Sequence, residues 1–392
     1  MNSKSYDLAI IGGGIHGVGA AQAAAAAGYS VAVLEMNGLA SGTSGKSSKL
    51  IHGGLRYLET AQLSLVKECL HERELLLKNA PGLVALKKIF IPVYRETVRR
   101  PWIIRAGLSL YYALSGFNRD SGFISVPKRE WANLDGIDIN GIQAVFQYHE
   151  AQTDDSLLTK AVMDSAMELG AALYMPAKFT GAIFENGGWS VTFEKNGIMS
   201  GLRASCLVNA GGPWANMILE KIVPTQKKVA VDLVQGSHII LEGRIERGIY
   251  YVESPMDRRG VFVMPWKDNT MIGTTETVFN GDPSGSVPLE SEIRYLLETA
   301  GRYFPRFHSA GAKDVLDSFA GLRVLPSAGG RPFSRSRETL LHCEDLSKTK
   351  LVSIIGGKLT SYRATGESVI GKIAPYLPSV KAKADTRKLP LK

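Results

Sequence analysis

Cysteine is scarce in this chain of 392 residues, which contains only Cys69, Cys206 and Cys343. The three lie far apart, and they form neither a CxxC pair nor a metal-ligand spacing. This pattern argues against a disulfide scaffold and against a cysteine metal cluster, so we expect no bound metal. Few and scattered cysteines are typical of proteins in a reducing compartment, which predicts a cytoplasmic location.

Long apolar runs are also missing from the chain. No stretch of about 18 apolar residues occurs, so the sequence predicts no membrane-spanning helix. Residues 1–6 are polar and lead directly into an apolar segment, without the apolar region and cleavage site of a signal peptide.

Acidic residues are in deficit. Lysine and arginine number 46 against 37 aspartates and glutamates, which gives a formal net charge of +9. An excess of this size favours anionic partners, namely a phosphorylated substrate, acidic lipid headgroups or nucleic acid. The sequence has no zinc finger, RNP motif or basic–aromatic repeat, so we do not expect a nucleic-acid partner.

Glycine is plentiful, with 41 residues, and one group of them forms a dinucleotide-binding pattern. Residues 6–11 predict a buried parallel strand, and Gly12, Gly14 and Gly17 follow it as GxGxxG. The first glycine permits the turn and the second lets the backbone approach a pyrophosphate. The third lets an alanine-rich helix, residues 18–27, pack closely on the strands.

A second apolar strand, residues 30–34, ends at Glu35, where a carboxylate can bind ribose hydroxyls. An acid at this position argues against NADP because it would repel the 2′-phosphate, but it does not separate NAD from FAD. The order of strand, loop, helix, strand and acid makes a glycine turn without a ligand the weaker alternative.

Residues 47–58 read SSKLIHGGLRYL and lie about thirty residues beyond the glycine loop. They bring a histidine, two glycines, an arginine and a tyrosine to the region where the cofactor should react. Hydroxyl side chains here can bond to phosphate or ribose, and we expect four of them along the cofactor: Thr43, Ser44, Ser47 and Ser48. The alternative is a polar surface loop.

Several segments together resemble the FAD-dependent glycerol-3-phosphate dehydrogenases, a family within the D-amino-acid-oxidase-like flavoproteins. They occur in the order typical of that family, and they are residues 10–21, 47–59 (SSKLIHGGLRYLE), 207–215 (LVNAGGPWA), 235–240 (QGSHII), 261–266 (VFVMPW), 272–276 (IGTTE), 320–326 (AGLRVLP) and 354–363 (IIGGKLTSYR).

The resemblance implies non-covalent FAD and oxidation of sn-glycerol 3-phosphate to dihydroxyacetone phosphate by hydride transfer to flavin N5. It also implies electron delivery to membrane quinone through peripheral attachment at the inner face of the cell membrane. Family members usually carry a further C-terminal helical domain, whereas this sequence stops at Lys392. A second departure is the basic loop at residues 329–337.

Two more glycine junctions are expected at the cofactor. A strand at residues 207–210 ends at Gly211, where the backbone can close on the flavin or its ribose chain. A strand at residues 351–355 is followed by a glycine turn and a helix from Thr360, whose N–H groups can face the flavin pyrimidine. This second junction contributes Gly356, Gly357, Leu359 and Thr360.

The predicted fold class is α/β, with a Rossmann-like FAD-binding domain and an interleaved substrate domain built on a mixed or antiparallel sheet. The length suits two domains. We assign residues 1–80, 150–225 and 340–392 to the FAD-binding domain, and residues 81–149 and 226–339 to the substrate domain.

Phosphate recognition calls for arginine forks and lysine point charges. The family-like segments and the basic loop offer four cations and two hydroxyl partners: Arg56, Arg323, Arg337, Lys358, Tyr57 and Thr275. For Arg323 and Lys358, which we also count as catalytic, the alternative is a solvated surface charge.

The base that accepts the alcohol proton is predicted to be His52, with His238 second, because imidazole has a suitable intrinsic pKa. Lys358 could serve only if crowding by arginines lowered its pKa. For either histidine the alternative is a structural hydrogen bond.

Residues 86–117 combine basic and aromatic–apolar side chains, a combination that suits an anionic bilayer surface. The basic members are Lys87, Lys88, Arg95, Arg99, Arg100 and Arg105. The alternative is a substrate-domain helix that buries its apolar face, and both interpretations can hold for different faces.

Two other functions compete with the glycerol-3-phosphate dehydrogenase hypothesis. One is a flavin oxidase or dehydrogenase of another small hydroxy or amino acid. The other is a non-catalytic FAD-binding subunit of a larger complex.

Overall fold

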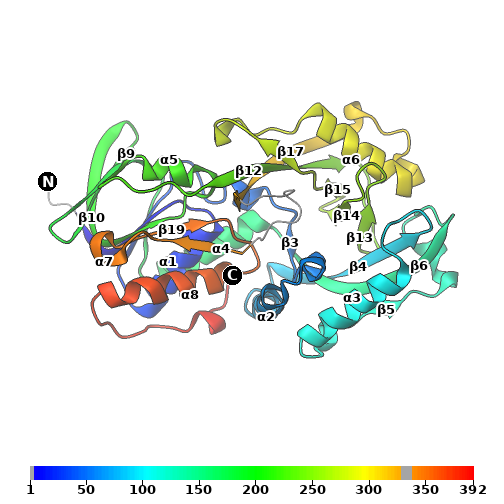
Figure 1. Cartoon of the computed structure of the whole chain (residues 1–392), viewed down its shortest axis with the longest axis horizontal. Coiled ribbons are helices and arrows are strands. Elements are labelled where there is room, and N and C mark those ends of the chain that lie inside the picture. The colour runs from blue at the N-terminus through cyan, green and yellow to red at the C-terminus, as the bar shows by residue number, and fades with distance from the viewer. Residues whose placement is uncertain (1–3, 328–337) are drawn as a thin grey trace.

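The computed structural model describes residues 4–327 and 338–392. It contains two large sheets, which lie one after the other along the long axis of the molecule (Figure 1). The predicted α/β class, with a Rossmann-like unit and a second, mixed sheet, is confirmed. Because each sheet takes strands from segments distant in sequence, the two are interleaved along the chain; the exact domain boundaries given above stay a prediction.

Sheet A has nine strands, with a parallel centre in which β1 pairs with β2 and β10, and β10 pairs with β19. An antiparallel meander at one side of this sheet is formed by β8, β9 and β10. The strands of sheet A are β1 (Ser5–Ile11), β2 (Val31–Leu34), β7 (Ala172–Tyr174), β8 (Lys178–Glu185), β9 (Gly188–Lys195), β10 (Ile198–Asn209), β11 (Ile222–Val223), β18 (Leu340–His342) and β19 (Leu351–Ile355).

Sheet B has ten strands and is antiparallel except where β13 runs parallel to β4. Its strands are β3 (Leu50–Ile51), β4 (Val84–Tyr94), β5 (Ile124–Ser125), β6 (Ile142–Thr153), β12 (Val231–Leu241), β13 (Ile249–Glu253), β14 (Gly260–Trp266), β15 (Asn269–Gly273), β16 (Thr277–Phe279) and β17 (Val315–Pro326).

The helices are α1 (Ile15–Ala27), α2 (Leu63–Asn79), α3 (Pro101–Leu114), α4 (Asp155–Glu168), α5 (Ala215–Leu219), α6 (Glu290–Tyr303), α7 (Leu346–Thr349) and α8 (Tyr362–Ile373). No helix among the described residues is long and apolar enough to cross a membrane.

Alternation along the central strands separates the two faces of sheet A, because successive side chains of a strand point to opposite sides. Leu8 and Ile10 of β1 are buried in a core shared with α1, α4 and α8. Ala9 and Ile11 belong to a second core, which the meander covers. Alanines along α1 let it approach the sheet closely, as the sequence predicts.

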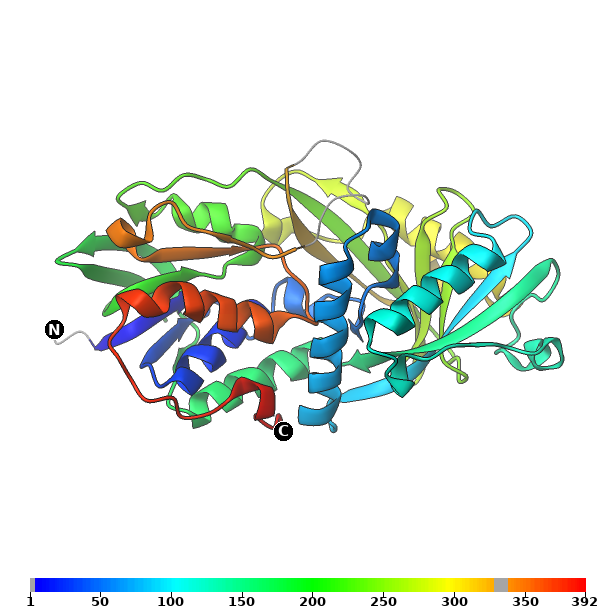
Figure 2. The ribbon, with the colours of Figure 1, turned by 60° about the horizontal axis from the view of Figure 1, so that its bottom comes forward.

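Helix α2 crosses the junction between the two halves of the molecule (Figure 2). Leu76 near its end packs into the core of α1 and α4. Cys69 and Leu70 pack into a different core, which lies against β4 and α3. This helix therefore fixes the two halves against each other beside the loops described next.

Candidate active site

A cavity of about 780 Å³ lies at the carboxyl ends of the parallel strands of sheet A. Loops that follow β1, β2, β10 and β19 form its wall, and we call it the glycine-walled cavity because Gly12, Gly14, Gly211, Gly356 and Gly357 line it. Open α/β sheets bind ligands outside the carboxyl ends of their strands, and the volume suits a large ligand.

Glycine is required at two positions of the first loop. A Cβ on Gly12, whose φ is +113°, would stand 2.5 Å from the carbonyl oxygen of Ala210. A Cβ on Gly17 would stand 2.0 Å from the carbonyl oxygen of Gly12. Gly17 does not line the cavity. It permits the close approach of α1, as its place in the pattern predicts.

Glu35 directly follows β2 and lines the glycine-walled cavity, and its side chain is buried. Its Oε2 accepts a hydrogen bond of 2.7 Å from the N–H of Gly13, and its Oε1 accepts one of 2.8 Å from Asn37. These bonds hold the carboxylate at the strand end, which is the position suited to ribose hydroxyls.

All four hydroxyl residues expected along the cofactor line this cavity, but each already has a protein partner. The Oγ of Ser44 accepts from the N–H of Ile15 at the start of α1, and Thr43 donates to the carbonyl of Leu322. Ser48 lies 2.9 Å from Nε2 of His238. These bonds fasten the loop to α1 and to sheet B.

The hydroxyl of Ser47 donates to Asp155 at 2.6 Å, and the same carboxylate pairs with the buried Lys49 at 2.6 Å. The two adjacent acids at the start of α4 thus have different roles. Asp154 caps the helix by accepting from the N–H groups of Ser156 and Leu157. Asp155 holds the cavity loop.

The glycine turn after β19 meets the first glycine loop at His16. A Cβ on Gly357 would stand 2.2 Å from Nε2 of His16, and Thr360 of the same turn accepts from the N–H of His52 at 3.1 Å. His16 lines the cavity, and burial lowers its pKa to about 4. Its Nδ1 has no partner among residues 4–327 and 338–392.

These features fit FAD. The cavity combines a glycine loop at the start of a helix, a buried acid at the end of the second strand and a second glycine turn. A ligand in the cavity could also bond to the buried histidine nitrogen that has no partner in the described part of the chain. The residues at these places are those that a dinucleotide needs along its length.

A second cavity of about 560 Å³ adjoins the first, and we call it the arginine-lined cavity because Arg56, Arg99, Arg259 and Arg323 line it. The two cavities share a set of lining residues, which we call the shared edge: Ser48, Leu50, His52, Tyr57, Thr274 and Arg323. A ligand in one cavity can therefore contact a ligand in the other at this edge.

Arg323 projects from β17 and is held on several sides. Its guanidinium lies 3.1 Å from Glu276 and donates to Oγ1 of Thr274 at 3.0 Å. Glu276 also pairs with Arg259 at 3.1 Å. One carboxylate therefore serves two arginines, which leaves the local charge positive.

Lys358 and Arg56 approach the same aromatic ring. The ammonium of Lys358 lies 3.8 Å from the ring centre of Tyr57, and the guanidinium of Arg56 lies 5.1 Å from it. Such cation–π contacts orient both charges at the shared edge. Nζ of Lys358 also lies 3.7 Å from the sulfur of Cys69, and burial raises the pKa of that thiol to about 11.

The two candidate bases occupy different environments. His52 lies at the shared edge and lines both cavities. His238 is buried, stacks on Phe319 and bonds to Ser48. Burial, with the nearby charges of Arg323 and Lys49, lowers the pKa of His238 to about 3. It is therefore a weak base at neutral pH.

Thr275 is not brought to either cavity. It is buried, and its hydroxyl donates to Glu292 and accepts from the N–H of Ser237. The preceding residue, Thr274, is the threonine that lines both cavities. Neighbouring residues of an extended segment point to opposite sides, which explains this difference of one position. Arg337 lies outside the described residues.

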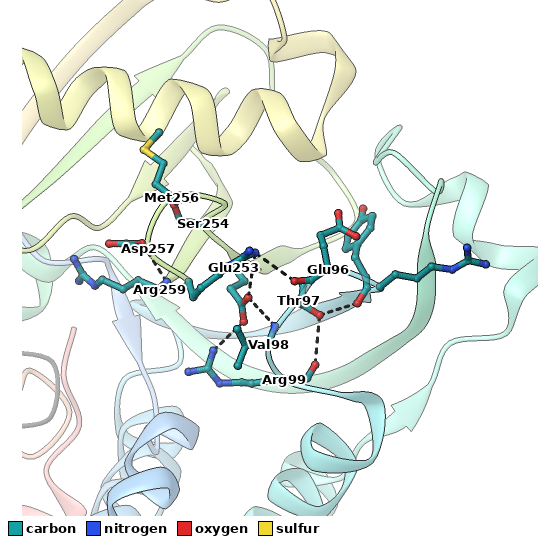
Figure 3. A network of polar contacts seen from close by, with 12 residues as sticks. Glu96, Thr97, Val98, Arg99, Glu253, Ser254, Met256, Asp257 and Arg259 are labelled. Carbon is teal, nitrogen blue, oxygen red and sulfur yellow. Dashed lines mark hydrogen bonds and ion pairs between the residues drawn. The ribbon is translucent and has the colours of Figure 1, made fainter.

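Arg99 departs from the expected membrane-facing role. Its side chain is 20% exposed and pairs with Glu59 at 2.5 Å and with Glu253 at 3.2 Å. Glu253 also accepts from the N–H of Val98, so it ties the segment before α3 to the end of β13 (Figure 3). Arg99 therefore belongs to the wall of the arginine-lined cavity.

The rest of residues 86–117 divides between core and surface. Ile89 and Phe90 lie in β4 and are buried in sheet B. Helix α3 buries one face and exposes the other, whose apolar residues, together with those flanking the helix, are Val98, Trp102, Ile103, Leu110 and Phe117. The buried face fits the alternative of a helix that packs inward, and the bilayer contact of the exposed face stays a prediction.

Sequence reasoning missed Arg259, Tyr148 and Tyr251 of the arginine-lined cavity. They lie singly in or beside strands of sheet B, without a glycine motif. The only local signal is that Tyr250 and Tyr251 are neighbours in a strand. Neighbouring residues of a strand face opposite sides of the sheet, so one of the two tyrosines must lie on each face.

A family model described as FAD dependent oxidoreductase matches residues 7–363. The glycerol-3-phosphate dehydrogenase of Pseudomonas aeruginosa is 37% identical, over 99% of this chain and 75% of that protein. The D-erythritol 1-phosphate dehydrogenase of Brucella abortus is 34% identical, over 96% and 75%. The chain thus spans about three quarters of the length of these relatives.

A solved structure has the same fold over the whole of this chain. The glycerol-3-phosphate dehydrogenase of Bacillus halodurans, complexed with FAD, superposes with a TM-score of 0.79 at 26% identity. The match covers 100% of this chain and 68% of that one.

Proposed function

The chain belongs to the FAD dependent oxidoreductase family, and we propose that it oxidises sn-glycerol 3-phosphate to dihydroxyacetone phosphate. The observation that carries the proposal is the shared edge, where a glycine-walled cavity meets an arginine-lined one. Relatives named glycerol-3-phosphate dehydrogenase, and a solved one with FAD, support it.

The reaction asks the protein to bind a phosphate, hold the alcohol and accept a proton. FAD, when bound, supplies the acceptor for the hydride that leaves the carbinol carbon. Arg56, Arg323 and Lys358 surround the shared edge with three cations, which suits a phosphate dianion.

We assign the proton-accepting role to His52, because it lines both cavities, whereas the pKa of His238 is about 3. The hydroxyl proton passes to the imidazole of His52 as the carbonyl of the product forms. His238 then has a positioning role, in which it holds the Ser48 hydroxyl at the shared edge.

The electron acceptor in this proposal is a membrane quinone, and the chain docks on the inner face of the membrane. The exposed apolar face of α3 supports docking, with Trp102 71% and Phe117 66% exposed. Arg100 and Arg105 are exposed on the same helix or directly before it, where they suit acidic headgroups. Trp102 and Leu110 also line the arginine-lined cavity, so its mouth would face the bilayer.

An anaerobic titration of the FAD-loaded protein tests the proposal. Glycerol 3-phosphate is expected to bleach the oxidised flavin spectrum stoichiometrically, whereas glycerol without phosphate is not. Bleaching by an amino acid or an unphosphorylated hydroxy acid would support the competing oxidoreductase function. A flavin that none of them reduces would support the non-catalytic subunit.

A further inference from the structure

Two tyrosines of the arginine-lined cavity have hydroxyls without a hydrogen-bond partner among residues 4–327 and 338–392. Tyr148 comes from β6 and Tyr251 from β13, and both line the cavity. Neither hydroxyl makes a hydrogen bond to the described part of the chain, and neither is sealed from solvent, although Tyr148 is only 5% exposed. The hydroxyls therefore open into the cavity.

Strand register places the two tyrosines on one face of sheet B. Tyr148 is opposite Ile89 on β4, and Ile89 is opposite Ile249 on β13, two residues before Tyr251. Residues two apart on a strand share a face. A Cβ on Gly260 would stand 2.0 Å from the hydroxyl of Tyr251, so glycine at this position leaves the space that the hydroxyl occupies.

The hydroxyls remain protonated, because burial raises the pKa of both tyrosines. Each can then donate one hydrogen bond and accept others. A hydroxyl that opens into a cavity bonds to water until a ligand takes the place of that water. A bound ligand that carries hydroxyl groups would satisfy both.

The charges beside the tyrosines argue against a second anion as that ligand. Arg99 beside Tyr251 is matched by two carboxylates, Glu59 and Glu253, whereas Arg259 shares the carboxylate of Glu276 with Arg323. Around Arg99 the cavity thus presents balanced donors and acceptors, in contrast to the shared edge, where cations predominate. Balanced donors and acceptors suit neutral hydroxyl groups.

The volume of the arginine-lined cavity also favours a ligand with additional hydroxyl groups. Cavities of this volume, 560 Å³, hold drug-sized molecules. A three-carbon phosphate bound at the shared edge would leave much of the cavity unfilled. We propose that the substrates include polyol phosphates of four or five carbons, whose additional hydroxyls bond to Tyr148 and Tyr251. This inference rests on the proposed function.

The test compares steady-state oxidation, with a soluble quinone as electron acceptor, of glycerol 3-phosphate, both enantiomeric phosphates of erythritol and ribitol phosphate. Wild-type protein should oxidise at least one longer phosphate with a kcat/KM within about tenfold of that for glycerol 3-phosphate. In Tyr148→Phe and Tyr251→Phe the ratio of longer to three-carbon kcat/KM should fall by about 2- to 10-fold, the usual effect of one neutral hydrogen bond.

Tyr250→Phe is the matched control. Tyr250 is adjacent on β13, but its hydroxyl bonds to Asp135 at 2.8 Å on the other face of the sheet. Its loss should leave the ratio unchanged. If a phenylalanine variant fails to fold, the wild-type ratios still decide the matter.

Three outcomes overturn the inference. If only glycerol 3-phosphate reduces the wild-type flavin, the inference fails while the proposed function stands. If the phenylalanine variants keep the wild-type ratio, the tyrosines do not read the longer substrate. If they change only the KM for a quinone, the subsite belongs to the acceptor. If no phosphate reduces the flavin, the proposed function itself fails.

Discussion

The two cavities share an edge, yet their walls are made of different parts of the chain. The glycine-walled cavity is formed largely by main chain at the ends of β1, β10 and β19, where glycines remove steric barriers. The arginine-lined cavity is formed by side chains from strands and helices of sheet B. A main-chain wall suits a ligand common to a large family, whereas a side-chain wall can change with the substrate.

The largest effect is expected where the main-chain wall is blocked. Gly17→Val would push a side chain into the carbonyl of Gly12, so the loop and the start of α1 must separate. We expect protein purified without FAD, measured by the absorbance ratio of flavin to protein.

Gly38→Val is the control for this substitution, because a Cβ at Gly38 meets no atom within 4 Å. It should retain FAD. If Gly17→Val also retained a full complement of FAD, the main-chain account of the first cavity would be wrong.

A smaller effect is expected at the side-chain wall. Arg323→Ala removes a cation of the shared edge, and Lys358→Ala removes one that lies beside it against the ring of Tyr57; neither substitution changes a glycine of the loops. FAD should stay bound, and kcat/KM for glycerol 3-phosphate should fall roughly 10- to 100-fold, since a hydrogen bond to a charged group contributes about 1.5–3 kcal/mol.

Arg294→Ala serves as the control for the loss of one arginine, because Arg294 is 69% exposed on α6. Its kinetics should match those of the wild type. Loss of FAD from Arg323→Ala or Lys358→Ala would mean that the two walls do not act separately.

Low pH should lower the free energy of unfolding through His238, which lines the glycine-walled cavity and bonds to Ser48 at the shared edge. Its pKa is about 3 in the folded chain, below the ordinary value of 6.5 for the side chain. Between these values the unfolded chain binds a proton that the folded chain does not, so stability falls as pH drops below about 6.5, by roughly 1.4 kcal/mol per pH unit.

Denaturant unfolding from pH 7 to pH 5 measures this slope. His238→Gln should flatten the slope, although it also costs packing at pH 7. His308→Gln, at an exposed position, should keep the wild-type slope. An equal slope in all three proteins would show that His238 does not titrate as described.

The smallest effect concerns the rim of the arginine-lined cavity. Arg100→Glu with Arg105→Glu should weaken binding to anionic vesicles by at least about tenfold, at roughly 1 kcal/mol for each charge near the surface. FAD content should not change. A vesicle sedimentation assay with Arg244→Glu and Arg294→Glu as the control pair would reveal an effect of net charge alone, and equal losses in both pairs would contradict docking through α3.

The sequence predicted the first cavity well because its parts are local. A glycine that permits a turn, and an acid at the next strand end, stand at fixed spacings from one another. Gly12, Gly14 and Glu35 could therefore be placed without knowledge of the distant chain. His16 was missed, because its importance arises only where the turn after β19 meets the first loop.

The second cavity was predicted only in part, because it depends on strand register and on distant ion pairs. Thr274 and Thr275 differ only in the side toward which they point. In the sequence Arg99 belongs to a basic segment, which favours a membrane-facing role. In the fold it pairs with Glu59 and Glu253, which are distant in sequence. Tyr148 and Tyr251 share a face of sheet B only because β4 pairs with both of their strands.

We propose that FAD lies along the main-chain wall of the glycine-walled cavity, with its reactive ring at the shared edge and facing the arginine-lined cavity. A crystal structure of the chain with FAD and dihydroxyacetone phosphate tests it most directly. We predict the isoalloxazine ring beside His52, Tyr57 and Arg323, with the product on the arginine side. A ring directed away from these residues, or a product bound elsewhere, would contradict the account.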